Sequence, residues 1–123
     1  MKRMTHFILG AVLAVASISA YAQQVFLEGF PDVPLLDGVN EIAEERVVFD
    51  TPAGTVAQTV LLGEKGAKEA LSRYAANLPT FGWQCSHTQI SLTCARDENI
   101  LLFKTTETAE KSGRIILRLE PTK

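Results

Sequence analysis

The two cysteines of the chain, Cys85 and Cys94, lie close together in the sequence with His87 between them. Two thiols and an imidazole at this spacing could bind zinc, provide a reactive thiol, or form a disulfide-closed hairpin. Cysteine zinc sites usually contain two cysteines about two to four residues apart, a half-site that is missing here. A C-x-x-C redox pair is also missing. We predict a disulfide between Cys85 and Cys94, no metal site and no bound cofactor, with zinc and a reactive thiol as alternatives.

A β-hairpin that places Cys85 opposite Cys94 would also sort the neighbouring side chains by polarity. Side chains alternate between the two faces of a strand, so Trp83 and Leu92 would share the face of the cysteines. The opposite face would carry Gln84, Ser86, Thr93 and Ala95. One register thus separates an apolar face from a polar one, which favours the hairpin and leaves His87 beside its turn without an assigned role.

Catalysis by a Ser-His-Asp or Cys-His arrangement would have to use His87, because His6 lies in an N-terminal segment that we expect to be removed. The sequence has no G-x-S-x-G motif and no glycine-rich phosphate loop. A pair of catalytic carboxylates would require the fold to bring scattered acidic residues together. The candidates are Asp32, Asp37, Glu44, Glu45, Asp97 and Glu98. We predict that the chain is not an enzyme and rank a small enzyme last among the alternatives.

Residues 1–22 have the three parts of a cleaved secretory signal peptide. Lys2 and Arg3 give a positive start, an apolar run follows, and Ala20-Tyr21-Ala22 is an A-x-A cleavage site. The apolar run is shorter than the roughly 20 residues that a membrane-spanning helix needs. We expect cleavage after Ala22 and a mature chain that is periplasmic, or secreted, without membrane insertion. Such an oxidising compartment also favours the disulfide.

The charge of the remaining chain argues against nucleic-acid binding. Residues 1–22 contain two basic residues and no acidic one, so the net charge of residues 23–123 is −4. The basic residues are scattered along the sequence, whereas nucleic-acid affinity rests on a basic patch that neutralises phosphates. We predict no nucleic-acid partner.

Residues 23–45 are predicted to form an extended arm. Prolines and glycines interrupt this segment too often for a helix, yet its apolar residues are too many for a free tail. We expect the arm to lie across the domain and to bury its side chains in alternation. The alternative is a segment that docks on a partner, through Phe26, Phe30, Pro31, Pro34 and Leu35.

Residues 46–123 are predicted to form a single α+β domain. The run Lys65–Leu78 places apolar residues three and four apart, which is typical of an amphipathic helix, and Pro79 ends it. Predicted strands cover residues 46–50, 55–62, 83–88, 91–96, 100–105 and 114–120. The order β-β-α-β-β-β-β predicts an antiparallel sheet of five or six strands with one helix packed on one face. In the last strand apolar and polar residues alternate toward the end, so we expect at least its far half to be covered on one face only.

Four short motifs link the chain to a known group. They are P-x-x-P-L-x-x-G at 31–38, F-D-x-P-x-G at 49–54, Y-x-x-x-L-P-x-x-G-W at 74–83 and R-x-x-N-x-L at 96–101. With them the chain resembles a family of small exported proteobacterial proteins, over most of its length after residue 22. The resemblance implies a periplasmic α+β domain and no particular activity. The two cysteines lie outside the shared pattern, so it implies no role for them.

The third motif reads as a structural corner. Tyr74 and Leu78 lie four apart on the apolar stripe of the predicted helix, Gly82 permits a sharp return, and Trp83 opens the next strand. Tyrosine and tryptophan bury large areas and each keeps one polar group that needs a partner. We therefore predict a corner of the core rather than a ligand cage.

Together these observations favour a non-catalytic binding or accessory module of the cell envelope. Its partner would be an envelope protein or ligand, contacted through the 23–45 arm or through an exposed face of the sheet. The alternative is an exported inhibitor of a hydrolase, which small size and a disulfide favour, although the sequence has no recognisable inhibitory loop.

The intact mass of the exported protein checks the disulfide. Without reductant we expect the mass of the chain from Gln23 less two hydrogens, because Cys85 and Cys94 are joined, and with reductant a gain of two hydrogens. Two free thiols in protein isolated from the periplasm would contradict the prediction.

Overall fold

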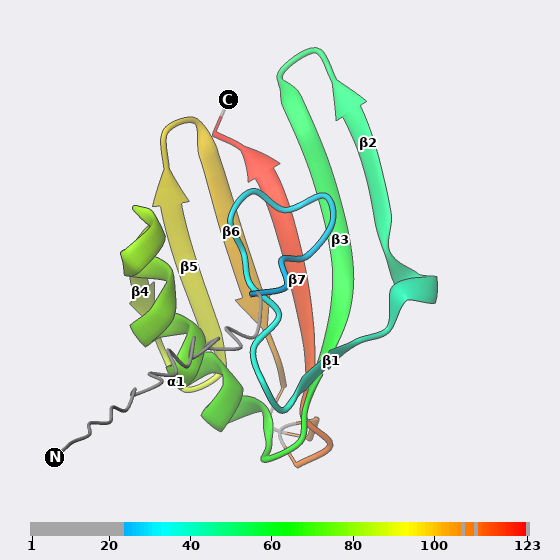
Figure 1. Ribbon diagram of the computed structural model, residues 1–123, viewed down its shortest axis with the longest axis vertical. Coiled ribbons are helices and arrows are strands. Elements are labelled where there is room, and N and C mark those ends of the chain that lie inside the picture. Colours follow the sequence, from blue (N-terminus) through cyan, green and yellow to red (C-terminus); the bar gives the residue numbers. More distant parts are fainter. Residues whose placement is uncertain (1–23, 107, 110, 123) are drawn as a thin grey trace, which may run out of the picture.

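One antiparallel sheet of seven strands organises the computed structural model, which describes residues 24–106, 108–109 and 111–122 (Figure 1). The strands are β1 Val39–Glu41, β2 Val47–Thr51, β3 Gly54–Gly63, β4 Gln84–His87, β5 Ser91–Arg96, β6 Asn99–Lys104 and β7 Arg114–Pro121. The helices are α1 Ala67–Asn77 and two short 3-10 helices, η1 Ala43–Glu45 and η2 Leu78–Phe81. The predicted signal peptide, residues 1–22 with its cleavage site, lies outside the described residues.

The strand order across the sheet is β1-β3-β7-β6-β5-β4, with β2 also paired to β3. Strands β4 to β7 form a meander, and β3 is long enough for β1 and β2 to pair with its two halves along the same side. The predicted α+β class, its element order and its single helix are confirmed. The sheet has one strand more than predicted, because Val39–Glu41, assigned to the arm, pairs with Leu61–Gly63.

Helix α1 is shorter than the predicted run Lys65–Leu78. Gly66 precedes it with a φ of +98°, outside the helical region, so the helix begins at Ala67. After Asn77 the chain tightens into η2, which carries Pro79 in its first turn. The apolar stripe of α1 packs on the sheet: Ala67, Ala70, Leu71 and Tyr74 are buried.

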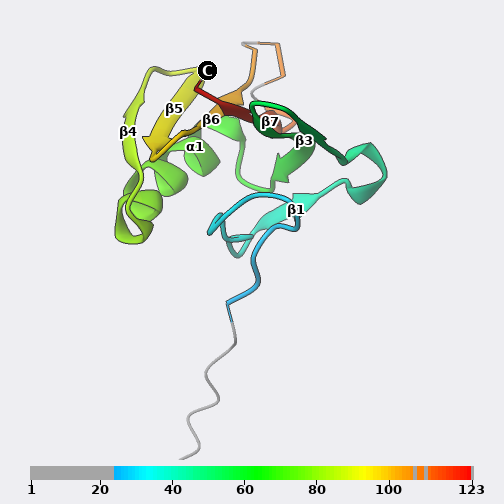
Figure 2. The ribbon, with the colours of Figure 1, turned by 90° about the horizontal axis from the view of Figure 1, so that it is seen from above.

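The core lies on one face of the sheet, which we call the inner face. Seen from above, α1 lies on this side, and so do residues 24–38, which we call the N-terminal segment (Figure 2). Along β7 the alternation predicted from the sequence holds, with Ile115, Leu117 and Leu119 buried and Ile116 exposed. Other large core side chains are Leu61, Leu71, Tyr74, Leu78, Trp83, Leu92, Leu101 and Phe103.

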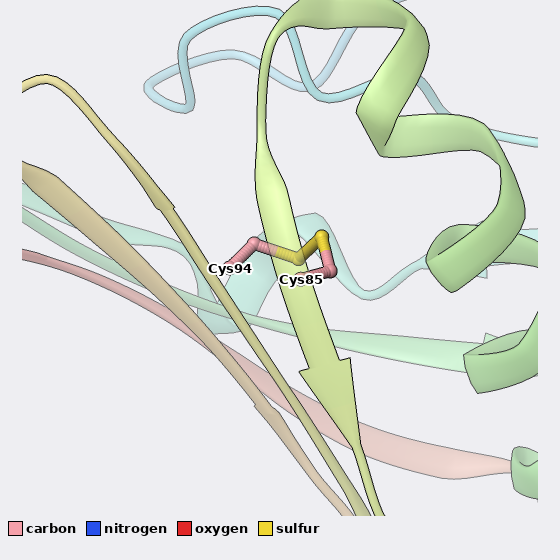
Figure 3. The surroundings of a disulfide bond; sticks show 2 residues. All are labelled: Cys85 and Cys94. Atoms are coloured by element: carbon pink, nitrogen blue, oxygen red, sulfur yellow. A yellow bond between two sulfur atoms is a disulfide. The ribbon is translucent and has the colours of Figure 1, made fainter.

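The β4–β5 hairpin has the predicted register and the predicted disulfide (Figure 3). Cys85 faces Cys94 and His87 faces Leu92. Leu92 and Cys94 are fully buried on the inner face, whereas the intervening polar side chains are exposed. The alternatives of a zinc site and a reactive thiol are thereby excluded for these two cysteines, since both sulfur atoms are in the disulfide.

The structural corner closes the core beside this hairpin. Tyr74, Leu78 and Trp83 are at most 2% exposed, and the Tyr74 hydroxyl donates a 2.7 Å hydrogen bond to the Pro34 carbonyl. Gly82 turns the chain with a φ of +91°, a left-handed conformation that glycine adopts without strain. The guanidinium of Arg96 lies 4.6 Å from the centre of the Trp83 ring, a cation–π contact that covers the indole.

Two glycines with the same φ differ in the space around them, and the comparison shows how tightly the loop before β7 is packed. Gly113 and Gly38 both have a φ of +79°. A Cβ at Gly113 would overlap the backbone of Gly63, whereas at Gly38 the nearest atom would be Arg73 Nη1 at 3.6 Å.

We expect Gly38→Ala to lower the free energy of unfolding by about 1 kcal/mol, the cost of φ strain alone. Gly113→Ala should cost at least about 2 kcal/mol more, because the backbones must also separate. Urea denaturation measures both. Equal losses would show that the close approach of Gly113 to Gly63 is not a constraint.

Candidate functional site

The N-terminal segment, first of the two surfaces that the sequence suggested, is built into the core. Phe30 is 3% exposed and Pro34 is also buried. The segment folds on itself, with hydrogen bonds of 2.8 Å from Leu27 N to Val33 O and from Leu35 N to Val25 O. Among the residues named for docking, Pro31 and Leu35 are half-buried, and only Phe26 is exposed, at 43%. Phe26 itself packs edge-on against Phe81, so of the five residues named for docking most are part of the fold, while the neighbouring Val25 is 59% exposed.

An ion pair fixes the end of this segment to the sheet. Glu41 on β1 is the centre, with a side chain only 9% exposed. Arg46 donates to both of its carboxylate oxygens, from Nε and Nη2, at 2.9 Å each. The hydroxyl of Thr59, buried on β3, donates a 2.6 Å bond to the same carboxylate. Arg46 Nη1 also lies 3.2 Å from the exposed Glu28.

These contacts make Glu41 a structural carboxylate rather than an acid or base. The hydrogen bond from Arg46 lowers the pKa of Glu41, burial acts in the opposite direction, and the bond from Thr59 lowers the pKa further. A general acid at neutral pH needs a raised pKa. Glu41 therefore stays ionised and holds β1, β3 and the start of β2 together.

Among the described residues that line its hollow, His87 has no carboxylate beside it. It is exposed at the end of β4 and lines a shallow hollow between the hairpin and α1, together with Lys68, Leu71, Ser72, Thr88 and Gln89. A Ser-His-Asp arrangement needs a carboxylate that orients the imidazole, and these lining residues supply none. Across the described part of the chain, no cluster of three His, Cys, Asp or Glu side chains could hold a metal ion.

Several acidic residues that the sequence left open as a catalytic pair are instead paired with arginines. Asp32 lies 3.0 Å from Arg96, and Glu45 lies 3.3 Å from Arg114. Asp97 also lies 3.9 Å from Arg96. The contacts of Asp32 and Glu45 join separate elements of the fold, and none of the three contacts brings two of the carboxylates together as a pair.

The second suggested surface, a face of the sheet, is open. We call it the outer face: the side of the sheet opposite α1 and the N-terminal segment (Figure 2). Its exposed apolar side chains are Val47 at 54%, Phe49 at 52% and Ile116 at 41%. In the ladder Phe49 pairs with Val56 and Ile116 pairs with Val60, and the row between these two pairs contains Val47, Gln58 and Arg118. Half-buried Leu62, Ile100 and Leu102 extend the patch across β3 and β6.

Polar side chains lie between the exposed apolar residues of the outer face. Arg118 on β7, in the row between Phe49 and Ile116, donates to Gln58 Oε1 at 3.0 Å and to Glu120. Arg114, nearer the start of β7, makes the ion pair with Glu45. Aromatic residues and arginine are enriched in protein–protein interfaces, and this uncovered face carries both. The outer face is the candidate functional site.

The sequence indicated part of this site and missed the rest. The alternation along β7 predicted that at least its far half is covered on one face only, and in the structure the uncovered face also includes Ile116, in the near half. The run Val47-Val48-Phe49 reads as core by composition, yet all three side chains are exposed because β2 lies at an edge of the sheet. Only the strand order places it there.

No family model, curated protein or solved structure matches the chain. The resemblance of its short motifs to exported proteobacterial proteins therefore stays a prediction. Among the described residues, no helix is both long and apolar enough to span a membrane.

Glu41→Gln tests the ion pair that fixes the N-terminal segment. Glu41 has a lowered pKa in the folded protein, so its contribution is present above its unfolded pKa of about 4.5. That contribution is lost as the pH falls through the folded pKa. At neutral pH we expect the substitution to cost about 1.5–3 kcal/mol of unfolding free energy.

In the original chain, protonation of Glu41 lowers the free energy of unfolding as the pH falls. The variant has no carboxyl group at position 41, so its free energy of unfolding should fall less with decreasing pH. Urea denaturation at a series of pH values measures both effects. Glu45→Gln, which removes an exposed ion pair, is the matched control and should cost at most about 1 kcal/mol. Equal losses for the two variants would contradict the structural role of Glu41.

Proposed function

We propose that the chain is a non-catalytic binding or accessory module of the cell envelope that holds a partner protein against the outer face of its sheet. The observation that carries the proposal is the exposed apolar patch of Val47, Phe49 and Ile116 on that face. When a partner covers apolar surface of this kind, the complex is stabilised by about 25 cal/mol per Å² of apolar area buried.

The chemistry of the face indicates the kind of partner. Its exposed apolar side chains alternate with polar ones, since Gln58 and Arg118 lie between Phe49 and Ile116. The side chains of Arg114 and Arg118 are both 43% exposed. Each guanidinium has donors left over from its present carboxylate partner, because arginine carries five N–H donors. A protein surface that combines apolar side chains with polar acceptors fits this arrangement.

The disulfide and the export pattern support a location in the periplasm. A cross-link between Cys85 and Cys94 persists in an oxidising compartment and is rare in the cytosol. The signal-like residues 1–22 would deliver the chain to such a compartment.

The absence of catalytic function is proposed on the state of the titratable groups. Glu41 is held ionised by Arg46 and Thr59, and Asp32 and Glu45 are paired with arginines. His87 lines a hollow without a carboxylate. The carboxylates thus make ion pairs that join separate elements of the fold.

A photoreactive side chain at Ile116 tests the proposal in cells that export the protein. Ile116 lies in the middle of the outer face, so we expect it to cross-link to a specific partner protein. The matched control is the same side chain at Ser72, which is exposed on α1 on the opposite side of the sheet, and it should not capture that partner.

A tagged chain without the photoreactive side chain should recover the partner that the cross-link identifies. Ile116→Lys in that tagged chain should lower the recovery by about tenfold, because the partner would bury an unpaired ammonium. Circular dichroism checks that the variant is folded. Equal capture from Ile116 and Ser72, or no specific capture from either, would contradict the proposal.

A further inference from the structure

The two edges of the sheet differ in a way that singles out β2. At one edge, β4 is four residues long and presents Gln84, Ser86 and His87. At the other edge, β2 presents Val47, Val48 and Phe49, which are 54%, 45% and 52% exposed. Edge strands carry unpaired main-chain groups, and proteins usually protect them with charges, proline or a short length. The run Val47–Phe49 has none of these protections.

The register of the β2–β3 hairpin shows which main-chain groups of β2 are free. Thr51 and Gly54 close a two-residue loop and pair directly, and such a closing pair exchanges hydrogen bonds. Hydrogen-bonded and non-hydrogen-bonded pairs alternate along an antiparallel ladder. Phe49 and Val47 therefore bond to β3, while the N–H and C=O groups of Val48 and Asp50 point away from the sheet. These groups form the template for a further strand.

The side chains of β2 and of the residue before it are complementary to those of a second copy of the same strand placed antiparallel to it. The stretch reads Arg46-Val47-Val48-Phe49-Asp50. If Val48 faces the Val48 of a second copy, Val47 faces Phe49 and Arg46 faces Asp50. Apolar side chains then meet apolar side chains at the three central pairs, and opposite charges meet at both ends. Cross-strand pairs of both kinds stabilise sheets.

We propose that the chain forms a two-fold symmetric dimer in which β2 pairs antiparallel with β2 of a second copy, centred on Val48. In this register Val48 forms a hydrogen-bonded pair with its copy, which agrees with the outward direction of its main-chain groups. The interface is isologous, as expected for a two-fold dimer. The two sheets become one continuous sheet.

Other registers fit less well. The outward main-chain groups of β2 recur every second residue, so only shifts by an even number of residues keep the hydrogen bonds. A shift by two places Val48 across from Asp50 and Arg46 across from Pro52, which has no N–H to donate. A shift by two in the opposite direction places Arg46 across from Val48. The register centred on Val48 alone matches apolar with apolar and charge with opposite charge.

The surroundings of β2 leave room for a short ladder of this length. Figure 1 shows η1 standing out from the sheet at the start of β2, which ends the straight edge there. At the other end, the loop at Pro52 turns the chain back into β3. Arg46 holds Glu41 through Nε and Nη2, and its Nη1 is the group directed at the exposed Glu28. Nη1 is therefore the donor best placed to face Asp50 of the second copy.

This inference goes beyond the proposed function and does not depend on it. The dimer uses the edge of β2, and Ile116, two strands away, remains uncovered on the outer face. Val47 and Phe49 of both copies lie on that same face, so the dimer joins two outer faces side by side. A failure of self-pairing would leave the proposed partner surface at Ile116 untouched.

Sedimentation equilibrium of the purified protein with its disulfide intact tests the proposal. We expect a monomer–dimer equilibrium in the original chain. Val48→Lys and Val48→Glu, each alone, should weaken the dimer by about tenfold or more, because two like charges meet at the two-fold axis. An equimolar mixture of the two variants should regain the dimer, because position 48 then faces a complementary charge. Ser86→Lys on the opposite edge strand is the matched control and should leave the dimer unchanged.

Each result has a defined meaning. A chain that stays monomeric up to its solubility limit overturns the proposal, as does a dimer that persists in Val48→Lys. Loss of the dimer in both variants without recovery in the mixture overturns the register centred on Val48. Circular dichroism checks that each variant is folded. Asp50→Lys, which places like charges across from Arg46, is a second variant at another exposed position and should weaken the dimer in the same direction.

Discussion

The structure depends on a mismatch between the width of its sheet and the cover that a single helix provides. Strands lie about 4.8 Å apart and a helix is about 10 Å wide, so α1 covers the inner face over β4 and β5 and leaves the rest open (Figure 1). The N-terminal segment fills that gap with Leu27, Phe30 and Val33. The hydrogen bond from Tyr74 to Pro34 joins the two covers. A segment that completes the core must itself be held in place at its end. The ion pair of Glu41 and Arg46 holds it there.

One side of the sheet receives all of this cover, and the other side receives none of it. The same strands therefore carry a buried row, such as Ile115 and Leu117, and an open row that includes Ile116. The covered side is held together in part by the ion pair of Glu41 and Arg46. Folding leaves two surfaces without a partner among the described residues: the outer face, with its exposed apolar side chains, and the edge of β2, with its unpaired main-chain groups. These are the surfaces through which the chain can bind another molecule.

The sequence predicted the features that local periodicity controls. The alternation around Cys85 and Cys94 was sufficient to predict the register of the hairpin, and spacings of three and four were sufficient to locate α1. The path of the N-terminal segment has no period, so its pairing as β1 could not be read from the residues around Val39. Exposure of Phe49 was also hidden, because composition cannot tell an edge strand from a central one. That distinction lies in the strand order, which arises from contacts between residues far apart in the sequence.

The position of β7 has a consequence for how the chain reaches its folded state. This last strand lies between β3 and β6, so that Ala57 pairs with Leu119 across more than half of the described chain. Chains are synthesised from the N-terminus, and the N-terminal segment packs on a surface that is incomplete until the final strand arrives. Before β7 is made, strand contacts are therefore confined to the pairing of β1 and β2 with β3 and to the meander of β4, β5 and β6. Such a topology has a high contact order, which slows folding and makes it cooperative. Until β7 is inserted, β3 and β6 lack the strand that lies between them in the folded sheet. Their apolar side chains are then incompletely packed, and a chaperone would protect the chain most at this stage.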